Sequence, residues 1–269
     1  MSEEINFSIA GGTSVRLNTA GKYCDKDIVV TALGGSGDGS ESELIWETII
    51  NRSVVSISIP DSITTIGRHA FARCYGLVSI SFPDGLNSIE EYAFFFCDHL
   101  ALTSLPDGLT DIGDYAFSYC AQLALTSLPD GLTSIGYQAF TGCKRLALTS
   151  LPAGLIKIDN VAFMSCTQLA LTSLPSGLTT IGSQCFDGCT QLALTSLPDG
   201  ITSIGIYAFR YCTGLTELTF EGTPTTIDKN AFYGCTNLKT INVPWSEGEV
   251  ANAPWGATNA TINYNYTGG

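Results

Sequence analysis

Ten cysteines carry the most reactive side chains of this 269-residue chain, and eight of them recur at one constant interval. These eight are Cys74, Cys97, Cys120, Cys143, Cys166, Cys189, Cys212 and Cys235. A zinc site needs four ligands that converge on one point, whereas this column supplies a line of thiols. The only close pair is Cys185 and Cys189, and no Cys-x-x-Cys motif occurs. We expect the column to pack inward as small hydrophobic side chains, without disulfides or metal.

Other catalytic residue types are sparse. The two histidines, His69 and His99, stand at variable positions of the repeat, where solvent exposure accounts for them. Serines and threonines recur because the repeat recurs, with no His or Asp partner in phase. Acids such as Asp84 and Asp107 adjoin glycines, where Asp favours turn geometry, and a weak Ca²⁺ site on stacked aspartates is the alternative. The sequence therefore predicts no catalytic site, cofactor or metal, and a protein that is not an enzyme.

The elements that carry these residues repeat with the same period as the cysteines. Three apolar columns accompany them, beginning at Ile66, Phe71 and Leu77 and ending at Ile227, Phe232 and Leu238. A fixed period of this length indicates one supersecondary unit that is stacked on copies of itself. Identical residues then form apolar ladders along the stack, and each buried Phe, Ile or Leu contributes about 1.5–3 kcal/mol.

Turn residues mark the corners of each unit. A proline column from Pro60 to Pro198 ends an extended run, and a glycine column from Gly85 to Gly200 follows it two positions later. Pro fixes φ and Gly accepts positive φ, so Pro-x-Gly predicts a tight turn. A second column, mostly Gly or Asp and beginning at Gly67, predicts another turn with left-handed backbone. The Ala-Phe-x-x-Cys segment that follows fits a short helical turn.

The unit that runs Ser-Ile-Gly-Tyr-Gln-Ala-Phe-Thr-Gly-Cys-Lys-Arg-Leu over residues 134–146, followed by Leu-Pro-x-Gly, resembles the BspA-type, or Treponema-type, leucine-rich repeat. The resemblance covers about residues 53–245. It implies a strand-rich α/β fold, a right-handed leucine-rich-repeat solenoid of eight 23-residue coils with capped ends, and strands on the concave side. It also implies a bacterial surface or secreted protein, and some members act as adhesins.

The flanks of the array predict further segments. We expect a small β-rich N-terminal module over 1–33, a Gly/Ser linker over 34–42, an N-terminal cap over 43–56, the solenoid over 57–243 and a C-terminal cap over 244–269. Trp46 is expected to cover one open end. Cys24, outside the column, is either a buried strand cysteine, which we favour, or a reactive thiol. Both flanks also resemble segments of prophage structural proteins from gut Firmicutes, which implies a tail-associated or host-recognition role as the alternative.

Composition restricts the partners. The net charge is −13, from 25 acidic and 12 basic residues, so the phosphate backbone of a nucleic acid would be repelled. No signal peptide is visible in this chain, which leaves open a leader that has been removed, and no apolar run is long enough to cross a bilayer, so we do not expect membrane insertion. The abundant Ser and Thr favour a protein or carbohydrate ligand, at the cell surface, outside the cell or on a virion.

Two surfaces are candidates for binding. In five successive units Leu replaces the outward Ser79, and strict strand alternation would expose a stripe of leucines that favours self-association. The alternative is a local bulge that turns these leucines inward and displays Thr103 and Ser104. The second surface is the variable convex face, which is rich in aromatic residues. The candidate partner-binding residues are Leu102, Leu125, Leu148, Leu171, Leu194, Tyr92, Phe95, Phe96, Tyr115, Tyr119, Tyr137, Tyr207 and Tyr211.

Overall fold

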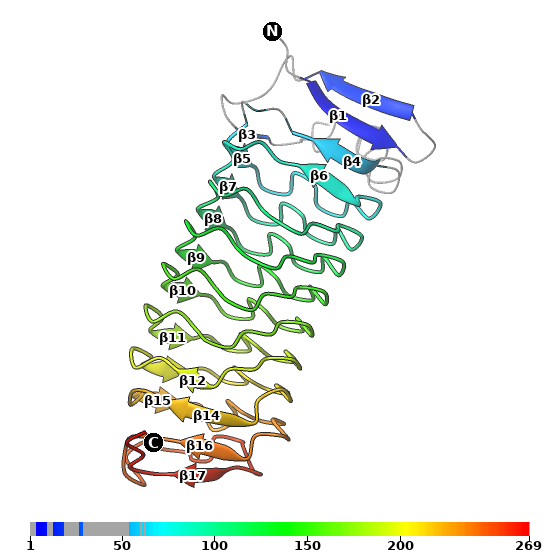
Figure 1. Cartoon of the computed structure of the whole chain (residues 1–269). Helices are drawn as coiled ribbons and strands as arrows, with labels where there is room; N and C mark the ends of the chain where they lie inside the picture. The colour runs from blue at the N-terminus through cyan, green and yellow to red at the C-terminus, as the bar shows by residue number, and fades with distance from the viewer. Residues whose placement is uncertain are drawn as a thin grey trace, which may run out of the picture.

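The chain coils into a stack of parallel turns, which Figure 1 shows following one another along a nearly straight axis. This computed structural model describes residues 54–59, 61 and 63–268, together with the strands Glu4–Ile9, Thr13–Asn18 and Asp27–Ile28. Each coil has three sides, two built from short strands and one from consecutive turns. Because equivalent strands pair in parallel one period apart, the prediction of a repeat solenoid is confirmed.

The first strand side is best developed at the two ends of the stack. It contains β4 (Val54–Ser58), β6 (Ser79–Ser81), β12 (Ser196–Leu197), β14 (Glu217–Phe220), β16 (Thr240–Asn242) and β17 (Thr261–Asn263). Ile57 lies opposite Ile80, and Ile241 lies opposite Ile262. At the N-terminal end β1 (Glu4–Ile9) and β2 (Thr13–Asn18) form an antiparallel hairpin that pairs with β4. The predicted linker and Trp46 lie outside the described residues, and the domain boundaries stay predictions.

The second strand side consists of two-residue strands, one in each coil. These are β5 (Thr65–Ile66), β7 (Ser88–Ile89), β8 (Asp111–Ile112), β9 (Ser134–Ile135), β10 (Lys157–Ile158), β11 (Thr180–Ile181), β13 (Ser203–Ile204) and β15 (Thr226–Ile227), and β3 (Asp27–Ile28) pairs with β5. The isoleucine of each strand points into the core. The eight isoleucines have at most 3% of their surface exposed, which confirms that column.

Phenylalanine and cysteine columns fill the centre of the stack. Consecutive phenylalanines from Phe71 to Phe232 stack with ring centroids 5.1–5.7 Å apart. All eight phenylalanines and all eight column cysteines are buried, as are Cys185 and the leucine column. The predicted inward packing of the thiols is therefore confirmed. At the C-terminal end, Trp245 and Trp255 are buried beside Phe220 and interrupt the period.

The Ala-Phe-x-x-Cys segment is not a helical turn, and the described part of the chain contains no helix. Two successive β-turns replace it. In the first coil these turns are closed by hydrogen bonds from Ala70 N–H to Gly67 O, 3.1 Å, and from Cys74 N–H to Phe71 O, 3.2 Å. The third residues, His69 and Arg73, have φ of 59° and 61°, which makes the turns type II. A helix is prevented because Phe71 N–H donates to Ala93 O of the next coil instead of to a carbonyl of its own coil.

The glycine columns also serve a purpose other than the predicted one. The φ of Gly136 is not left-handed, but a Cβ there would lie 2.6 Å from the backbone N of Asp114 in the preceding coil. Glycine is therefore needed at this position because neighbouring backbones approach closely, and Gly113, Gly182 and Gly205 are similarly crowded, whereas Glu90, Asp159 and Asp228 occupy the column in other coils. The glycines of the Pro-x-Gly corners, such as Gly108, likewise lack positive φ. Left-handed glycines occur instead at Gly142, Gly188 and Gly234, immediately before the column cysteines.

Candidate binding surface

The leucines that replace the outward serine are buried, so the predicted exposed leucine stripe is wrong. Leu102 is 9% exposed, Leu194 is 1%, and Leu125, Leu148 and Leu171 are 0%. The reason is a change in register. Exposed and buried residues alternate strictly in β6, whereas in the next coil two residues separate the inward Leu102 and Leu105. The intervening Thr103 and Ser104 are exposed, as the bulge alternative predicted. These five leucines stabilise the core and cannot contact a partner.

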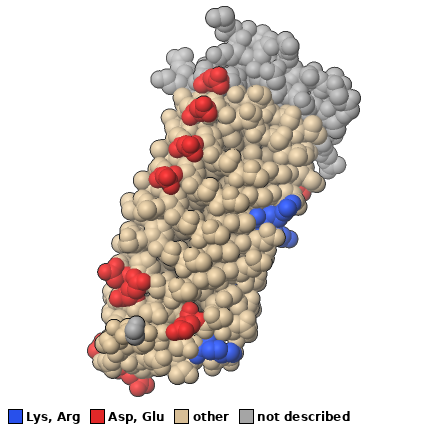
Figure 2. All heavy atoms as spheres, in the orientation of Figure 1, with Lys and Arg blue, Asp and Glu red and all other residues tan. Residues whose placement is uncertain are grey.

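Much of the first strand side carries no charged side chains. Figure 2 shows acidic side chains in file along one edge of the stack and a broad uncharged face beside them. The exposed acids that follow the corner prolines, Asp61, Asp84, Asp107 and Asp130, recur once per coil over the first four coils. Within the described residues no group of three His, Cys, Asp or Glu side chains is arranged to hold a metal ion. The alternative of a weak Ca²⁺ site on the aspartates therefore gains no support.

Aromatic side chains gather on the turn side over the first four coils. We call this group, defined by His69, Tyr92, Phe95, Phe96, Tyr115, Tyr119 and Tyr137, the first aromatic cluster. Its rings stack along the axis, because equivalent positions of successive coils lie one above the other. Ring centroids are 4.7 Å apart for His69 and Tyr92, 4.4 Å for Tyr92 and Tyr115, and 4.5 Å for Phe96 and Tyr119. Phe95 lies between the two stacks and makes edge contacts with both.

The backbone positions these rings, except those of Phe95 and Tyr137, at the third residue of a type II turn. Tyr92, Tyr115, Phe96 and Tyr119 have φ between 56° and 62°, a region that bulky residues rarely occupy. Coil-to-coil hydrogen bonds impose this conformation, as in the 2.8 Å bond from Tyr115 N–H to Tyr137 O. The ring of Tyr119 lies over Gly142, where a Cβ would approach its Cδ1 to 2.8 Å. Glycine in the next coil therefore leaves space for the ring.

The hydroxyl of Tyr115 remains neutral at physiological pH. Loss of hydration, followed by hydrogen bonding with Tyr137, raises the pKa of Tyr115 to about 12. Gln138 Nε2–H donates to the Tyr137 hydroxyl at 3.0 Å. The Tyr115 hydroxyl can thus both donate and accept a hydrogen bond when a partner approaches.

A second aromatic cluster occupies the same side near the C-terminal end. It is defined by Tyr207, Arg210, Tyr211 and Tyr233. Arg210 Cζ lies 4.6 Å from the ring centre of Tyr207 and 5.4 Å from that of Tyr211, which is the geometry of cation–π contacts. Its Nε–H also bonds both carboxylate oxygens of the buried Asp187 at 3.0 Å. Tyr211 and Tyr233 remain 48% and 49% exposed.

The structure thus divides the aromatic candidates between two places. Tyr92, Phe95, Phe96, Tyr115, Tyr119 and Tyr137 meet in the first cluster, and Tyr207 and Tyr211 meet in the second, four coils later. His69 and Arg210 were missed by the sequence reasoning. The signal for His69 was present, since it precedes Tyr92 by one period. The same signal was present for Arg210, since its partner Asp187 precedes it by one period.

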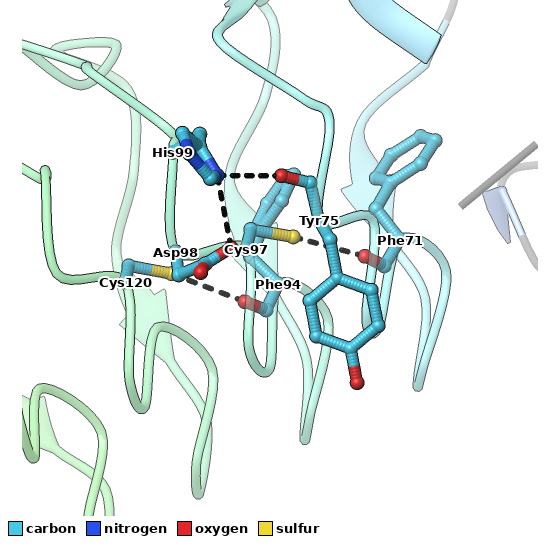
Figure 3. A network of polar contacts seen from close by, with 7 residues as sticks. All are labelled: Phe71, Tyr75, Phe94, Cys97, Asp98, His99 and Cys120. Atoms are coloured by element: carbon cyan, nitrogen blue, oxygen red, sulfur yellow. Dashed lines mark hydrogen bonds and ion pairs between the residues drawn. The ribbon is translucent and has the colours of Figure 1, made fainter. Parts of the chain in front are cut away.

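The thiols and histidines are engaged in structural contacts. From Cys97 onward each column thiol donates to the phenylalanine carbonyl of the preceding coil, with Cys97 Sγ 3.0 Å from Phe71 O (Figure 3). Burial raises the pKa of the Cys97 and Cys120 thiols, so the nucleophilic thiolate is suppressed. His99 Nδ1 lies 2.8 Å from Tyr75 O and 3.2 Å from a carboxylate oxygen of Asp98. Both are acceptors, so this nitrogen must be the donor.

A polar groove that the sequence reasoning missed crosses the second strand side. It has a volume of about 460 Å³ and is lined by Lys157, Asp159, Thr180, Ser203 and Thr226, among others. Gly182 and Gly205 contribute to its lining without side chains, for the steric reason given for Gly136. Lys157 Nζ and Asp159 Oδ2 form an ion pair of 2.8 Å at one end. The groove offers hydroxyls and one ion pair to a polar ligand, but no aromatic ring.

Comparison with known proteins supports the repeat architecture. The family model described as "BspA type Leucine rich repeat region (6 copies)" matches residues 49–170 and 145–253. A leucine-rich repeat protein from Bacteroides ovatus is 25% identical with a TM-score of 0.59, over 79% of this chain and 61% of that one. This chain therefore spans about three fifths of that protein's length.

Two further solved structures are similar at lower TM-scores. The Treponema pallidum leucine-rich repeat protein is 36% identical, with a TM-score of 0.46, over 51% of this chain and 64% of that one. A leucine-rich cell surface protein from Faecalibacterium prausnitzii is 25% identical, with a TM-score of 0.39, over 80% and 79%. No curated protein matches the sequence. Among the described residues, no helix has the length and hydrophobicity that crossing a membrane requires.

Proposed function

Because this chain belongs to the BspA-type leucine-rich repeat family, we propose that it is a non-enzymatic binding scaffold that recognises a protein through the aromatic clusters of its turn side. The observation that carries the proposal is the concentration of stacked and exposed aromatic side chains on one face of an otherwise regular stack. Tyrosine is enriched at protein interfaces because it combines a large apolar ring with a hydroxyl.

Ring orientation favours a protein over a glycan as the ligand of the first cluster. A sugar ring packs against the open face of an aromatic side chain. In the first cluster the faces of Tyr92, Tyr115 and Phe96 are already covered by one another at 4.4–4.5 Å or by their neighbours. What remains outward are ring edges and hydroxyls, which suit the mixed carbonyl, aromatic and aliphatic groups of a protein surface.

The location that goes with this proposal is outside the cell or at the bacterial cell surface. The family resemblance supports this location, and adhesion is the role it implies. The prophage tail-associated role is not tested by any of the comparisons and stays the alternative. A carbohydrate ligand would have to use the polar groove at Lys157 and Asp159 or the strand side.

Binding to defined probes tests the proposal. The purified chain is offered a phage-displayed library of random twelve-residue peptides and, in parallel, an array of glycans. We expect enriched peptides to lose at least about tenfold in affinity for the Tyr119→Ser and Tyr211→Ser variants, as at interface hot spots. Ile156→Ser is the matched control, because Ile156 is 62% exposed and lies outside the turn side. Peptides that bind all variants equally, or glycans enriched in place of peptides, would refute the proposal.

A further inference from the structure

The hydrogen-bond ladder of the second strand side is interrupted between β10 and β11. The strands from β3 to β10 form one sheet, and β11, β13 and β15 form another, although β11 follows β10 directly along the stack (Figure 1). On both sides of the break the residue after the strand isoleucine donates to the preceding coil, as Gly205 N–H does to Ile181 O at 2.9 Å. No such bond joins Gly182 N–H to Ile158 O, and this N–H has no other partner in the part of the chain that the structure describes. The break therefore leaves a half-buried backbone donor unpaired.

The polar groove described above opens at this break. Gly182 and Gly205 line it and occupy a column that carries Asp159 in the coil before them and Asp228 in the coil after them. The two glycines thus leave a hollow between two acids. Backbone packing maintains this hollow, because a Cβ at Gly205 would lie 2.7 Å from the backbone N of Ser183.

Three hydroxyls line the groove at regular spacing. Thr180 pairs in register with Ser203, and Ser203 with Thr226, so one hydroxyl stands in each of three consecutive coils. Neighbouring strands lie about 4.8 Å apart. None of the three hydroxyls forms a hydrogen bond within residues 63–268, whereas Thr202, in the adjacent column, donates to Thr179 O at 3.0 Å. The row can therefore donate to a ligand and accept from it.

The groove carries no net charge. Lys157 and Asp159 are the charged residues of its lining, and they pair with each other at 2.8 Å. The second carboxylate oxygen of Asp159 accepts the Asn160 N–H at 2.8 Å. Since the whole chain has a net charge of −13 and Lys157 is already paired, the groove does not attract an anion. These groups favour an uncharged ligand that is rich in hydrogen-bonding groups.

We infer that the groove binds a short, uncharged oligosaccharide that lies along the axis of the stack, at a second site separate from the aromatic clusters. A linear glycan presents hydroxyls at intervals of one sugar ring, which is about as long as one coil is high. Its oxygens can accept from Gly182 N–H and from the hydroxyls of Thr180 and Ser203. The volume of about 460 Å³ lies within the range of small-ligand sites, about 300–1,000 Å³.

The spacing of the hydroxyls disfavours a peptide in this groove. An extended peptide directs equivalent groups to one side only at every second residue, about 6.6–6.8 Å apart, which does not match hydroxyls that recur every ~4.8 Å. The groove has no aromatic ring on which a sugar could stack. Binding therefore depends on hydrogen bonds alone and is weak, because each of them replaces a hydrogen bond to water.

An NMR titration of the ¹⁵N-labelled chain tests this site. The probes are the neutral trisaccharides maltotriose, cellotriose and chitotriose, with trigalacturonate as the anionic control and trialanine as the peptide control. We expect at least one neutral trisaccharide to shift the amide signals of Gly182 and Gly205 with a dissociation constant of about 1 mM. The absence of shifts up to about 20 mM, or tighter binding of either control, overturns the proposal.

Removal of single hydroxyls tests the contacts. Ser203→Ala and Thr180→Val should each raise the dissociation constant about two- to tenfold, as the loss of one neutral hydrogen bond does. Ser134→Ala is the matched control, because Ser134 occupies the same column in β9, is half-buried like Ser203 and does not line the groove. It should leave the constant unchanged. If Ser203→Ala and Ser134→Ala have equal effects, the groove is not the site.

The same variants separate this site from the proposed function. Tyr119→Ser and Tyr211→Ser should weaken peptide binding and leave the trisaccharide constant unchanged, whereas Ser203→Ala should do the reverse. If the trisaccharide constant depends on Tyr119 or Tyr211, the sugar binds on the turn side and the groove is refuted. If no peptide binds while the trisaccharide still depends on Ser203, the proposed function fails and the groove stands.

Discussion

The core and the turn side of this solenoid use the same backbone period in opposite ways. In the core, Phe, Cys, Ile and Leu return at the same position of every coil, and the buried phenylalanines stack in one continuous file. On the turn side the backbone repeats just as regularly, yet the third residue of the first turn is His69, Tyr92, Gln138 or Val161 in different coils. The hydrogen bonds that hold the turns come from the backbone. Side chains there can therefore change without loss of the stack.

High pH should destabilise the core of the stack more than it weakens the turn-side contacts. Burial raises the pKa of eight thiols above the ordinary value of 9.0, those of Cys97, Cys120, Cys143, Cys166, Cys185, Cys189, Cys212 and Cys235. The folded chain keeps these protons when the unfolded chain loses them. The stability contribution is thus complete below pH 9 and falls as pH rises, by up to about 1.4 kcal/mol per pH unit for each thiol.

Urea unfolding at pH 7, 9 and 10.5 measures this effect. We expect little change up to pH 9 and a steep fall of the midpoint above it. Cys143→Ser should reduce the slope, because one titrating thiol is removed. A midpoint that is the same at pH 7 and pH 10.5 would contradict the assignment of the thiols to the core.

Truncation of a central ring should be the most damaging single substitution. Phe140 is fully buried and stacks on Phe117 at 5.6 Å and Phe163 at 5.5 Å. Phe140→Ala should lower the free energy of unfolding by about 3–5 kcal/mol, because the cavity cannot collapse between two neighbouring coils. Tyr211→Ala, on the turn side, should cost less than about 1 kcal/mol. Equal losses in thermal or urea unfolding would erase the distinction between the two regions.

The thiol hydrogen bonds offer a finer test of the core. Cys143 Sγ donates to Phe117 O at 3.1 Å, and this carbonyl also accepts the Cys120 N–H. Cys143→Ala removes the donor and leaves a small void, so we expect a loss of about 1–2 kcal/mol. Cys143→Ser keeps a donor and should cost less. If serine is the worse replacement in urea unfolding, the column acts only as small hydrophobic side chains.

The core could be predicted from the sequence because its columns depend only on the period. Where local backbone geometry decides the orientation or role of a residue, the prediction from the sequence was wrong. The leucines at Leu102 and its equivalents were assigned by strict alternation, and one extra outward residue in the bulge moves them to the core. The glycines of the column that begins at Gly67 were attributed to positive φ, whereas at Gly113, Gly136, Gly182 and Gly205 the structure needs glycine for close approach between coils. The positive φ falls on aromatic residues such as Tyr92, which no propensity rule selects, because neighbouring coils impose it.

The column of Ser165 offers a test of the positive φ that neighbouring coils impose, and the expected change in stability is the smallest of those predicted. Ser165 has φ of 62°, while Gly142 and Gly188 occupy the same position one coil before and one coil after it. Glycine adopts this conformation without the strain that an L side chain incurs, although it loses more freedom on folding. Ser165→Gly should therefore stabilise the chain by about 0.5–1 kcal/mol, measured by the urea midpoint. Val161→Gly is the contrast, because Val161 is 7% exposed and its loss removes packing as well as strain. If Ser165→Gly destabilises the chain instead, the backbone of the turn side is not strained there and the side chain itself holds the turn.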